Sequence, residues 1–306
     1  MTSSKSRPVA NGRPIDFFLI GPPKCGTTTV HQVLRRHPHI FLPANKDKSF
    51  LLDVVPNYVT EDELPAYYTG YRGEALIGCS EASLIGFPSA LERLHRYSPD
   101  ARLIAILRNP VERAYSAYWF ARRNLIEDCV AFETALEREP ERARGDHRAV
   151  ANLRYAYQGR YAEQLESVYS LFPREQVFVG LFEDLRADPA AFFGALLSWL
   201  GADPEKLPPD ATQAHSNAAG MPRSRVVQHV FGRPPAWLRN AYHALLPARA
   251  KAVLWSRLAE PVLALNRAPF RYPPMAAATR AHLAAYFAPH NEKLAAMLGR
   301  DLEAWR

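Results

Sequence analysis

A short loop with two glycines, placed between an apolar run and a helical pattern, is the feature that most constrains how this chain folds. Residues 17–20 are apolar, residues 21–26 read Gly-Pro-Pro-Lys-Cys-Gly, and three threonines follow. Backbone N–H groups at the start of a helix are unpaired and lie at the positive end of its dipole, so they favour anions. The junction therefore predicts a phosphate-binding loop, made of Lys24, Cys25, Gly26, Thr27, Thr28 and Thr29.

The position of the lysine separates this loop from that of ordinary nucleotide triphosphatases. Their pattern, G-x-x-x-x-G-K-[ST], places the lysine directly after the second glycine. Here Gly21 and Gly26 keep the glycine spacing, but Thr27 follows Gly26 and the lysine precedes it at position 24. A P-loop nucleotide kinase or NTPase also needs a magnesium-holding aspartate after an apolar strand, where this chain has Arg108. The kinase or NTPase remains an alternative that these positions disfavour.

The spacing of apolar residues predicts strands that alternate with helices. Strands are expected at 16–20, 40–42, 75–79, 102–107 and 176–181, and helices at 25–36, 88–97, 109–124, 157–171, 189–200 and 276–298. We expect the last helix to be interrupted at Pro289, because proline lacks the N–H that continues a helix. Alternation of this kind is typical of an α/β fold with a parallel sheet covered on both faces.

Length and composition set the domain organisation. A chain of 306 residues with 48% apolar content can bury one large core, and neither disorder nor a fibrous repeat fits. We expect a flexible N-terminal segment at 1–14 and a single domain at 15–306. Within that domain, proline pairs punctuate residues 203–274 and predict a less regular extension on the same core.

Charge and cysteine content limit the partners and the compartment. The formal net charge of +7 is spread along the chain and shows no clustered basic residues with interleaved aromatics, so a non-catalytic nucleic-acid-binding protein is a weaker alternative. Cys25, Cys79 and Cys129 are widely spaced, which suggests a reducing compartment. No apolar stretch is long enough to span a bilayer, and we expect a cytoplasmic protein.

A second marker lies at the end of the strand expected at 102–107. Arg108 follows it directly, at the edge where open α/β sheets bind ligands, and Ser116 lies about two helical turns further on. Arginine offers a planar fork of donors that suits a phosphate, and serine adds a neutral donor. Together with the loop, Arg108 and Ser116 predict a second phosphate-binding element.

With both markers in view, the chain resembles the sulfotransferases that use 3′-phosphoadenosine 5′-phosphosulfate (PAPS), within the group related to heparan sulfate sulfotransferases. The resemblance spans most of the chain and rests on residues 23–29, 108–116, 172–173, 183–185, 287–292 and 298–302. It implies a three-layer α/β/α fold of the P-loop nucleotide-kinase-like sulfotransferase type. It also implies PAPS as donor, adenosine 3′,5′-bisphosphate (PAP) as product, no metal, and Arg223 with Ser224 closing over the 3′-phosphate.

The reaction implied by the resemblance is the transfer of a sulfuryl group to a hydroxyl or amine of a carbohydrate or other small molecule. Lys24 is expected to stabilise charge that grows on the leaving oxygen. In the related enzymes a Lys-Glu pair after the first helix supplies the base, and here the matching pair is Lys46-Asp47. The shorter aspartate leaves two candidates for the base, Asp47 and Glu81.

Overall fold

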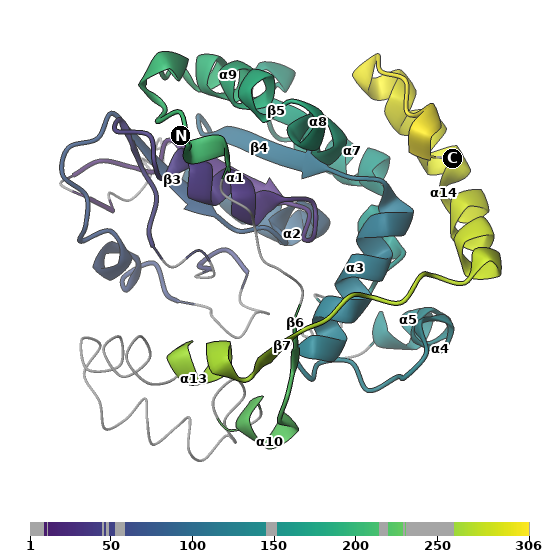
Figure 1. Ribbon diagram of the computed structural model, residues 1–306. Coiled ribbons are helices and arrows are strands. Elements are labelled where there is room, and N and C mark those ends of the chain that lie inside the picture. Colours follow the sequence, from purple (N-terminus) through teal and green to yellow (C-terminus); the bar gives the residue numbers. More distant parts are fainter. Residues whose placement is uncertain are drawn as a thin grey trace.

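The computed structural model describes residues 9–10, 12–44, 46, 49–52, 59–144, 152–213, 220–228, 230 and 260–305. Five parallel strands form a central sheet in the order β2-β3-β1-β4-β5 (Figure 1). The strands are β1 (Phe17–Gly21), β2 (Ile40–Phe41), β3 (Leu76–Ser80), β4 (Arg102–Leu107) and β5 (Val177–Leu181). Each lies within two residues of its predicted position, and the predicted parallel sheet is confirmed.

Alternating side chains of the central strand explain how both faces of the sheet are covered. Phe18 and Ile20 of β1 pack in one core cluster with side chains of α2 (Pro88–Tyr97) and α7 (Tyr161–Tyr169). Phe17 and Leu19 point to the opposite face and pack with α1 (Thr27–Leu34) and α9 (Pro189–Leu200). Successive strand residues face opposite sides of a sheet, so this alternation produces the predicted three layers, α/β/α.

Two helices have the boundaries that the sequence predicted, and two others differ from the prediction at their N-termini. Helices α2 and α9 begin at the prolines and end at the residues that the sequence indicated. Helix α1 begins at Thr27, two residues later than expected, because Gly26 has a φ of 87°. The helix expected at 157–171 is a 3-10 turn, η3 (Tyr157–Gly159), followed by α7.

The predicted interruption at Pro289 is wrong. Helix α14 (Ala277–Leu298) continues through this residue. Phe287 before the proline and Asn291 and Leu294 after it are all buried, so both halves of the helix are held by packing. A proline removes one backbone hydrogen bond from the helix, and burial on both sides outweighs that cost.

A third core cluster lies beside the sheet. Helix α3 (Pro110–Arg123) packs there with α4 (Phe132–Glu137), with Tyr155 and with the buried face of α14. The sequence did not predict α4, the short α5 (Glu139–Arg142) or α8 (Phe182–Ala187). Short 3-10 turns also link the main elements: η1 (Leu64–Tyr67), η2 (Leu84–Gly86), η4 (Arg174–Gln176), η5 (Pro204–Lys206), η6 (Ala211–Gln213) and η9 (Glu303–Trp305).

The region expected to be a less regular extension is described only in part, since residues 214–219, 229 and 231–259 lie outside the described residues. Strands β6 (Gly220–Pro222) and β7 (Arg267–Pro269) form an antiparallel pair beside α3 (Figure 1). The short helices α10 (Arg225–Val227) and α13 (Glu260–Leu265) flank this pair.

The described part of the N-terminal segment packs against the domain. Val9 and Ala10 are buried, and the guanidinium of Arg13 donates to the carbonyl oxygens of Glu74 and Ala75. Residues 1–8 and 11 lie outside the described residues. Among the helices that the structure describes, none combines the length and the apolar character that crossing a membrane requires.

Candidate active site at the carboxyl edge of the sheet

The carboxyl ends of four neighbouring strands bring the candidate site residues to one edge of the sheet. Strand β1 leads into the loop at 21–26, β3 into Glu81, β4 into Arg108 and β5 into Phe182. After β1 the chain adds β2 and then β3 on one side of it, and then adds β4 and β5 on the other side. Open α/β sheets bind ligands at the carboxyl ends of their strands, where the strand order reverses.

Two glycines allow the loop to turn tightly against its neighbours. Gly21 has a φ of 106°, and a Cβ atom there would lie 1.6 Å from the carbonyl oxygen of Ala82. Gly26 has a φ of 87°, and its Cβ would lie 2.7 Å from the ring of Phe182. Because a side chain fits at neither position, both glycines are required for the loop to reach the start of α1.

Lys24 and Arg108, which the sequence assigned to two separate phosphate elements, lie together. Nη1 of Arg108 donates a hydrogen bond to the carbonyl oxygen of Lys24 at 3.2 Å. The Lys24 backbone has a φ of 72°, which is uncommon for a residue with a side chain. The end of β4 therefore supports the loop in the conformation that presents its lysine.

An aromatic ring lies under each of these two cations. The ammonium nitrogen of Lys24 lies 4.5 Å from the ring centroid of Phe120 on α3. The guanidinium carbon of Arg108 lies 4.9 Å from the ring centroid of Phe182 on α8. Both distances are within the range of cation–π attraction, and neither ring is among the site residues predicted from the sequence.

Lys24 lies in a strongly positive environment. Burial, followed by the charges of Arg123, Lys46 and Arg108, lowers the pKa of Lys24 to about 8. The positive charge of each neighbour disfavours the protonated form of Lys24, and a bound polyanion would relieve that repulsion. The local electrostatics therefore favour an anionic ligand.

Lys46 is a site residue that the sequence analysis noted only as the partner of Asp47. Its ammonium donates to the hydroxyl oxygens of Thr27 at 2.9 Å and Thr28 at 2.8 Å, in the first turn of α1. This places another cation at the helix N-terminus, where anions bind. The signal in the sequence is the Lys46-Asp47 pair, which predicts a base through its aspartate and equally offers a cation through its lysine.

Tyr161 contacts both the loop at 21–26 and the residue that follows β4. Its hydroxyl donates to the carbonyl oxygen of Arg108 at 2.8 Å and lies 3.8 Å from the sulfur of Cys25. Cys25 is fully buried, and burial raises the pKa of its thiol to about 11. A protonated, inaccessible thiol is a poor nucleophile, so Cys25 contributes packing and its backbone to the loop.

Glu81 is buried and its carboxylate is engaged by the segment at 49–52. The hydroxyl of Ser49 donates to Oε2 at 2.6 Å, and the N–H groups of Phe50 and Leu51 donate to Oε1 at 3.0 and 3.4 Å. Burial raises the pKa of Glu81 to about 7 in spite of these donors. The carboxylate holds the 49–52 segment against the end of β3.

A small cavity lies between α1 and the end of β3. His31, Ser80, Lys46 and Tyr68 are among the residues that line it, and it has room for about one water molecule. Burial and the charges of Lys46 and Arg35 lower the pKa of His31 to about 3, so its ring is neutral, and Nδ1 lies 2.8 Å from the Ser80 hydroxyl. All of the residues that line this cavity are among those that the structure describes.

For the remaining predicted site residues, the structure shows no hydrogen bond to Lys24 or Arg108 among the described residues. Thr29 and Ser116 are half-buried on α1 and α3, and Asp47 lies outside the described residues. The Ser224 hydroxyl accepts from the N–H of Val227, and Arg223 is exposed. Among the hydrogen bonds of the described residues, none joins Arg223 or Ser224 to Lys24 or Arg108.

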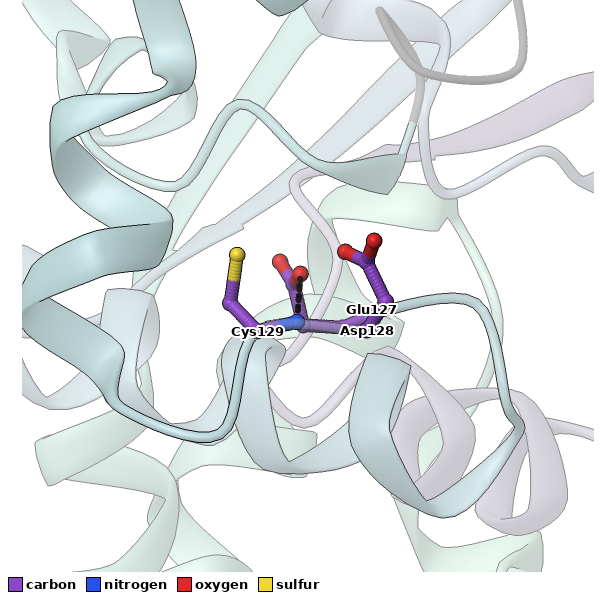
Figure 2. A group of neighbouring side chains, drawn as sticks. All are labelled: Glu127, Asp128 and Cys129. Carbon is purple, nitrogen blue, oxygen red and sulfur yellow. Dashed lines mark hydrogen bonds between the residues drawn. The ribbon is translucent and has the colours of Figure 1, made fainter.

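Within the part of the chain that the structure describes, one group of side chains, Glu127, Asp128 and Cys129, has the composition of a metal site (Figure 2). Both carboxylate oxygens of Glu127 accept from Arg142 at 2.7 Å, and the Tyr155 hydroxyl and the Cys129 N–H donate as well. Burial opposes ionisation, but these hydrogen bonds outweigh it and lower the pKa of Glu127 to about 2. A carboxylate with all of these donors is an ion-pair partner and does not fit a metal ligand.

Comparison with known proteins assigns this architecture to a family. The family described as "Sulfotransferase domain" matches residues 14–230, which is more than half of the chain. The protein therefore belongs to the sulfotransferase family and is a sulfotransferase. The resemblance found in the sequence is confirmed, and the kinase and nucleic-acid-binding alternatives are set aside.

Individual relatives agree with this assignment. The human bifunctional heparan sulfate N-deacetylase/N-sulfotransferase 3 is 26% identical over 94% of this chain and 31% of its own length. Human carbohydrate sulfotransferase 15 is 32% identical over 37% of this chain and 28% of its own length. The chain thus spans less than a third of either relative. A crystal structure of a sulfotransferase from Alicyclobacillus acidocaldarius is 26% identical, with a TM-score of 0.69, and covers 96% of this chain and 99% of that one.

Proposed function

We propose that this sulfotransferase takes its sulfuryl group from PAPS and transfers it in line to a hydroxyl or amine of a carbohydrate or other small molecule. The observation that carries the proposal is the gathering of Lys24, Lys46 and Arg108 around the N-terminus of α1. A donor with a phosphosulfate and a separate phosphate matches two cationic elements held side by side. PAPS supplies the activated sulfuryl group, and PAP is the product that leaves.

In this proposal the loop and the end of β4 bind different parts of the donor. Lys24, Lys46 and the backbone of residues 25–29 hold the phosphosulfate, and Arg108 with Ser116 holds the 3′-phosphate. Arg223 and Ser224, which directly follow β6, complete the 3′-phosphate side. The fit rests on charge: the neighbours of Lys24 lower its pKa to about 8, and an anionic ligand reverses that effect.

Lys24 has the role of stabilising the leaving group. As the bond between sulfur and the bridging oxygen breaks, negative charge grows on that oxygen, and a fixed ammonium beside it lowers the barrier. The new bond forms between sulfur and the acceptor oxygen or nitrogen, whose proton passes to a base. Because the Glu81 carboxylate already accepts from three donors, Asp47 is the base in this proposal.

The relatives support a carbohydrate as the acceptor class. The names of the matched human proteins specify heparan sulfate and carbohydrate as the molecules on which those enzymes act. We extend the carbohydrate class to this chain as part of the proposal. No metal takes part in it, since the cations around the loop supply the positive charge that magnesium supplies in phosphoryl transfer.

Calorimetry and a mutant test the donor. The wild-type protein should bind PAP tightly without magnesium and should bind Mg-ATP far more weakly. Lys24→Ala should lower kcat for PAPS-dependent transfer by roughly 10²- to 10³-fold, the usual cost of losing one such donor. A preference for Mg-ATP, or undiminished turnover in the variant, would contradict the proposal.

A further inference from the structure

The contact between Lys24 and Phe120 points to a role for a side chain that the proposed function leaves unassigned. Phe120 lies in the last turn of α3, three residues before Arg123, and is half-buried. Its ring centroid lies 4.5 Å from the Lys24 ammonium nitrogen and 5.2 Å from the Arg123 guanidinium carbon. One aromatic ring therefore contacts two cations at the edge of the loop.

We propose that Phe120 is a positioning residue, whose ring holds the Lys24 ammonium beside the loop against repulsion by Arg123. This inference rests on the proposed function, because it concerns how Lys24 is presented to the leaving group. Phe120 acts through Lys24 and transfers no proton.

Repulsion makes such a support necessary. Arg123 is the charged neighbour that most lowers the pKa of Lys24, ahead of Lys46 and Arg108. A flexible lysine side chain surrounded by three cations would turn away from them towards water. The face of an aromatic ring attracts a cation electrostatically, so the ring offers the ammonium a favourable place that is close to the loop.

An aromatic ring also suits the chemistry better than a carboxylate would. An aspartate or glutamate beside Lys24 would fix the ammonium, but it would neutralise the charge that the leaving oxygen needs. A ring carries no net charge, so Lys24 keeps its full positive charge while its position is restricted. Preorganised charge of this kind stabilises a transition state without reorganisation during the reaction.

The test compares three substitutions at one position in the full-length protein. Phe120→Leu keeps apolar bulk and removes the π face, whereas Phe120→Trp and Phe120→Tyr keep it. We expect Phe120→Leu to lower kcat with PAPS about 10-fold, the size expected for one partly desolvated cation–π contact. The KM for PAPS should change by less than about threefold, and Trp and Tyr should restore kcat.

The pH profile gives a second readout that a merely structural role would not move. Arg123 on α3, Lys46, Arg108 at the end of β4 and Cys25 in the loop are the charged or titratable groups that act on Lys24. Removing the ring leaves these charges in place and removes an attraction for the ammonium. The basic limb of kcat/KM should therefore move to lower pH in Phe120→Leu, by about 0.5 to 1 unit.

The control is Tyr169→Leu, which removes a ring from under Arg174, at 4.3 Å, at the far end of α7. This variant should match wild type in kcat and in pH profile. Wild-type kcat in Phe120→Leu, or equal losses in the Leu, Trp and Tyr variants, would overturn the positioning role. Absence of PAP binding and PAPS turnover in the wild-type protein would instead contradict the proposed function, so the two failures are distinguishable.

Discussion

The guanidinium of Arg108 donates a hydrogen bond from Nη1 to the carbonyl oxygen of Lys24, at 3.2 Å. This bond connects the end of β4 to a residue whose left-handed backbone, with a φ of 72°, is unfavourable for lysine. The strand end therefore does more than offer a cation to a ligand. It also stabilises the loop conformation that presents the Lys24 side chain, and the two phosphate elements are coupled.

Replacement of Arg108 should affect both elements. We expect Arg108→Ala to weaken PAP binding roughly 10- to 100-fold, the cost of losing charge-assisted hydrogen bonds. Because the 3′-phosphate contact is lost, the ratio of the affinities for PAP and AMP should fall as well. Arg108→Lys should recover part of the PAP affinity through its charge. Calorimetry with both nucleotides measures this ratio, and an unchanged ratio in Arg108→Ala would show that Arg108 does not face the 3′-phosphate.

The pH dependence of the reaction should report the protonation of Lys24. Burial and neighbouring cations lower its pKa to about 8, and only the protonated form stabilises a leaving oxygen. We expect kcat/KM for PAPS to fall as pH rises above about 8. The corresponding fall in kcat should occur at higher pH, because a bound anion raises the pKa of the lysine.

Lys24→Arg provides the control for this profile, since arginine stays protonated across the range. Its residual activity should show no basic limb near pH 8. A limb that persists unchanged in Lys24→Arg would assign the titration to another group.

The loop and the strand ends could be predicted from the sequence because local rules determine them. A glycine-rich turn after an apolar strand gives a helix N-terminus, and a residue such as Arg108 that follows a parallel strand must lie at the same edge of the sheet. Long-range contacts followed no such rule. Pro289 stays within a helix because residues on both sides of it are buried. Lys46 contacts the first turn of α1 although it lies 18 and 19 residues further along the chain than the two threonines that it meets there.

The aromatic rings of the site show the same division. The aromatic residues on α3 recur at helical spacing in the sequence, a pattern that is typical of a core. Trp119 stacks on Tyr272, with an angle of 8° between the two ring planes, whereas its neighbour Phe120 contacts Lys24. Periodicity assigns a face of a helix, but it does not say whether a neighbouring cation lies on that face. Only the fold distinguishes these two rings.

Two isosteric variants should separate the candidates for the base. Asp47→Asn should abolish transfer and leave PAP binding intact, as expected when a base is removed. Glu81→Gln should retain activity within about 10-fold, since an amide can still accept from the backbone N–H groups of Phe50 and Leu51. Single-turnover rates with PAPS measure both effects. Near-normal rates in Asp47→Asn together with a large loss in Glu81→Gln would reverse the assignment.

Glu81 should also influence stability in a defined pH range. Its folded-state pKa is raised to about 7 from 4.5, so the native state binds the proton more tightly than the unfolded state. The contribution of Glu81 to stability is therefore complete below pH 4.5 and is lost as pH rises through about 7. Denaturant unfolding at pH 5 and pH 8 measures the free energy of unfolding of wild type and Glu81→Gln. From pH 5 to pH 8 the wild type should lose stability relative to the variant, which has no carboxyl group to ionise at this position. A constant difference would mean that the Glu81 pKa is not raised.

The ion pair between Glu127 and Arg142 should be necessary for stability, although it resembles part of a metal site. Arg142→Met would leave a buried carboxylate without its cation, which typically costs about 3 to 5 kcal/mol. The double variant Glu127→Gln with Arg142→Met should recover most of this loss, because no uncompensated charge remains and the Tyr155 hydroxyl can still donate to the Gln oxygen.

Since the pKa of Glu127 is lowered to about 2 from 4.5, the contribution of this ion pair to wild-type stability is present above pH 4.5 and lost as pH falls towards 2. Urea unfolding at pH 7 and pH 3 should therefore show a smaller gap between wild type and Arg142→Met at pH 3, and stabilisation of wild type by added zinc would contradict a purely electrostatic role.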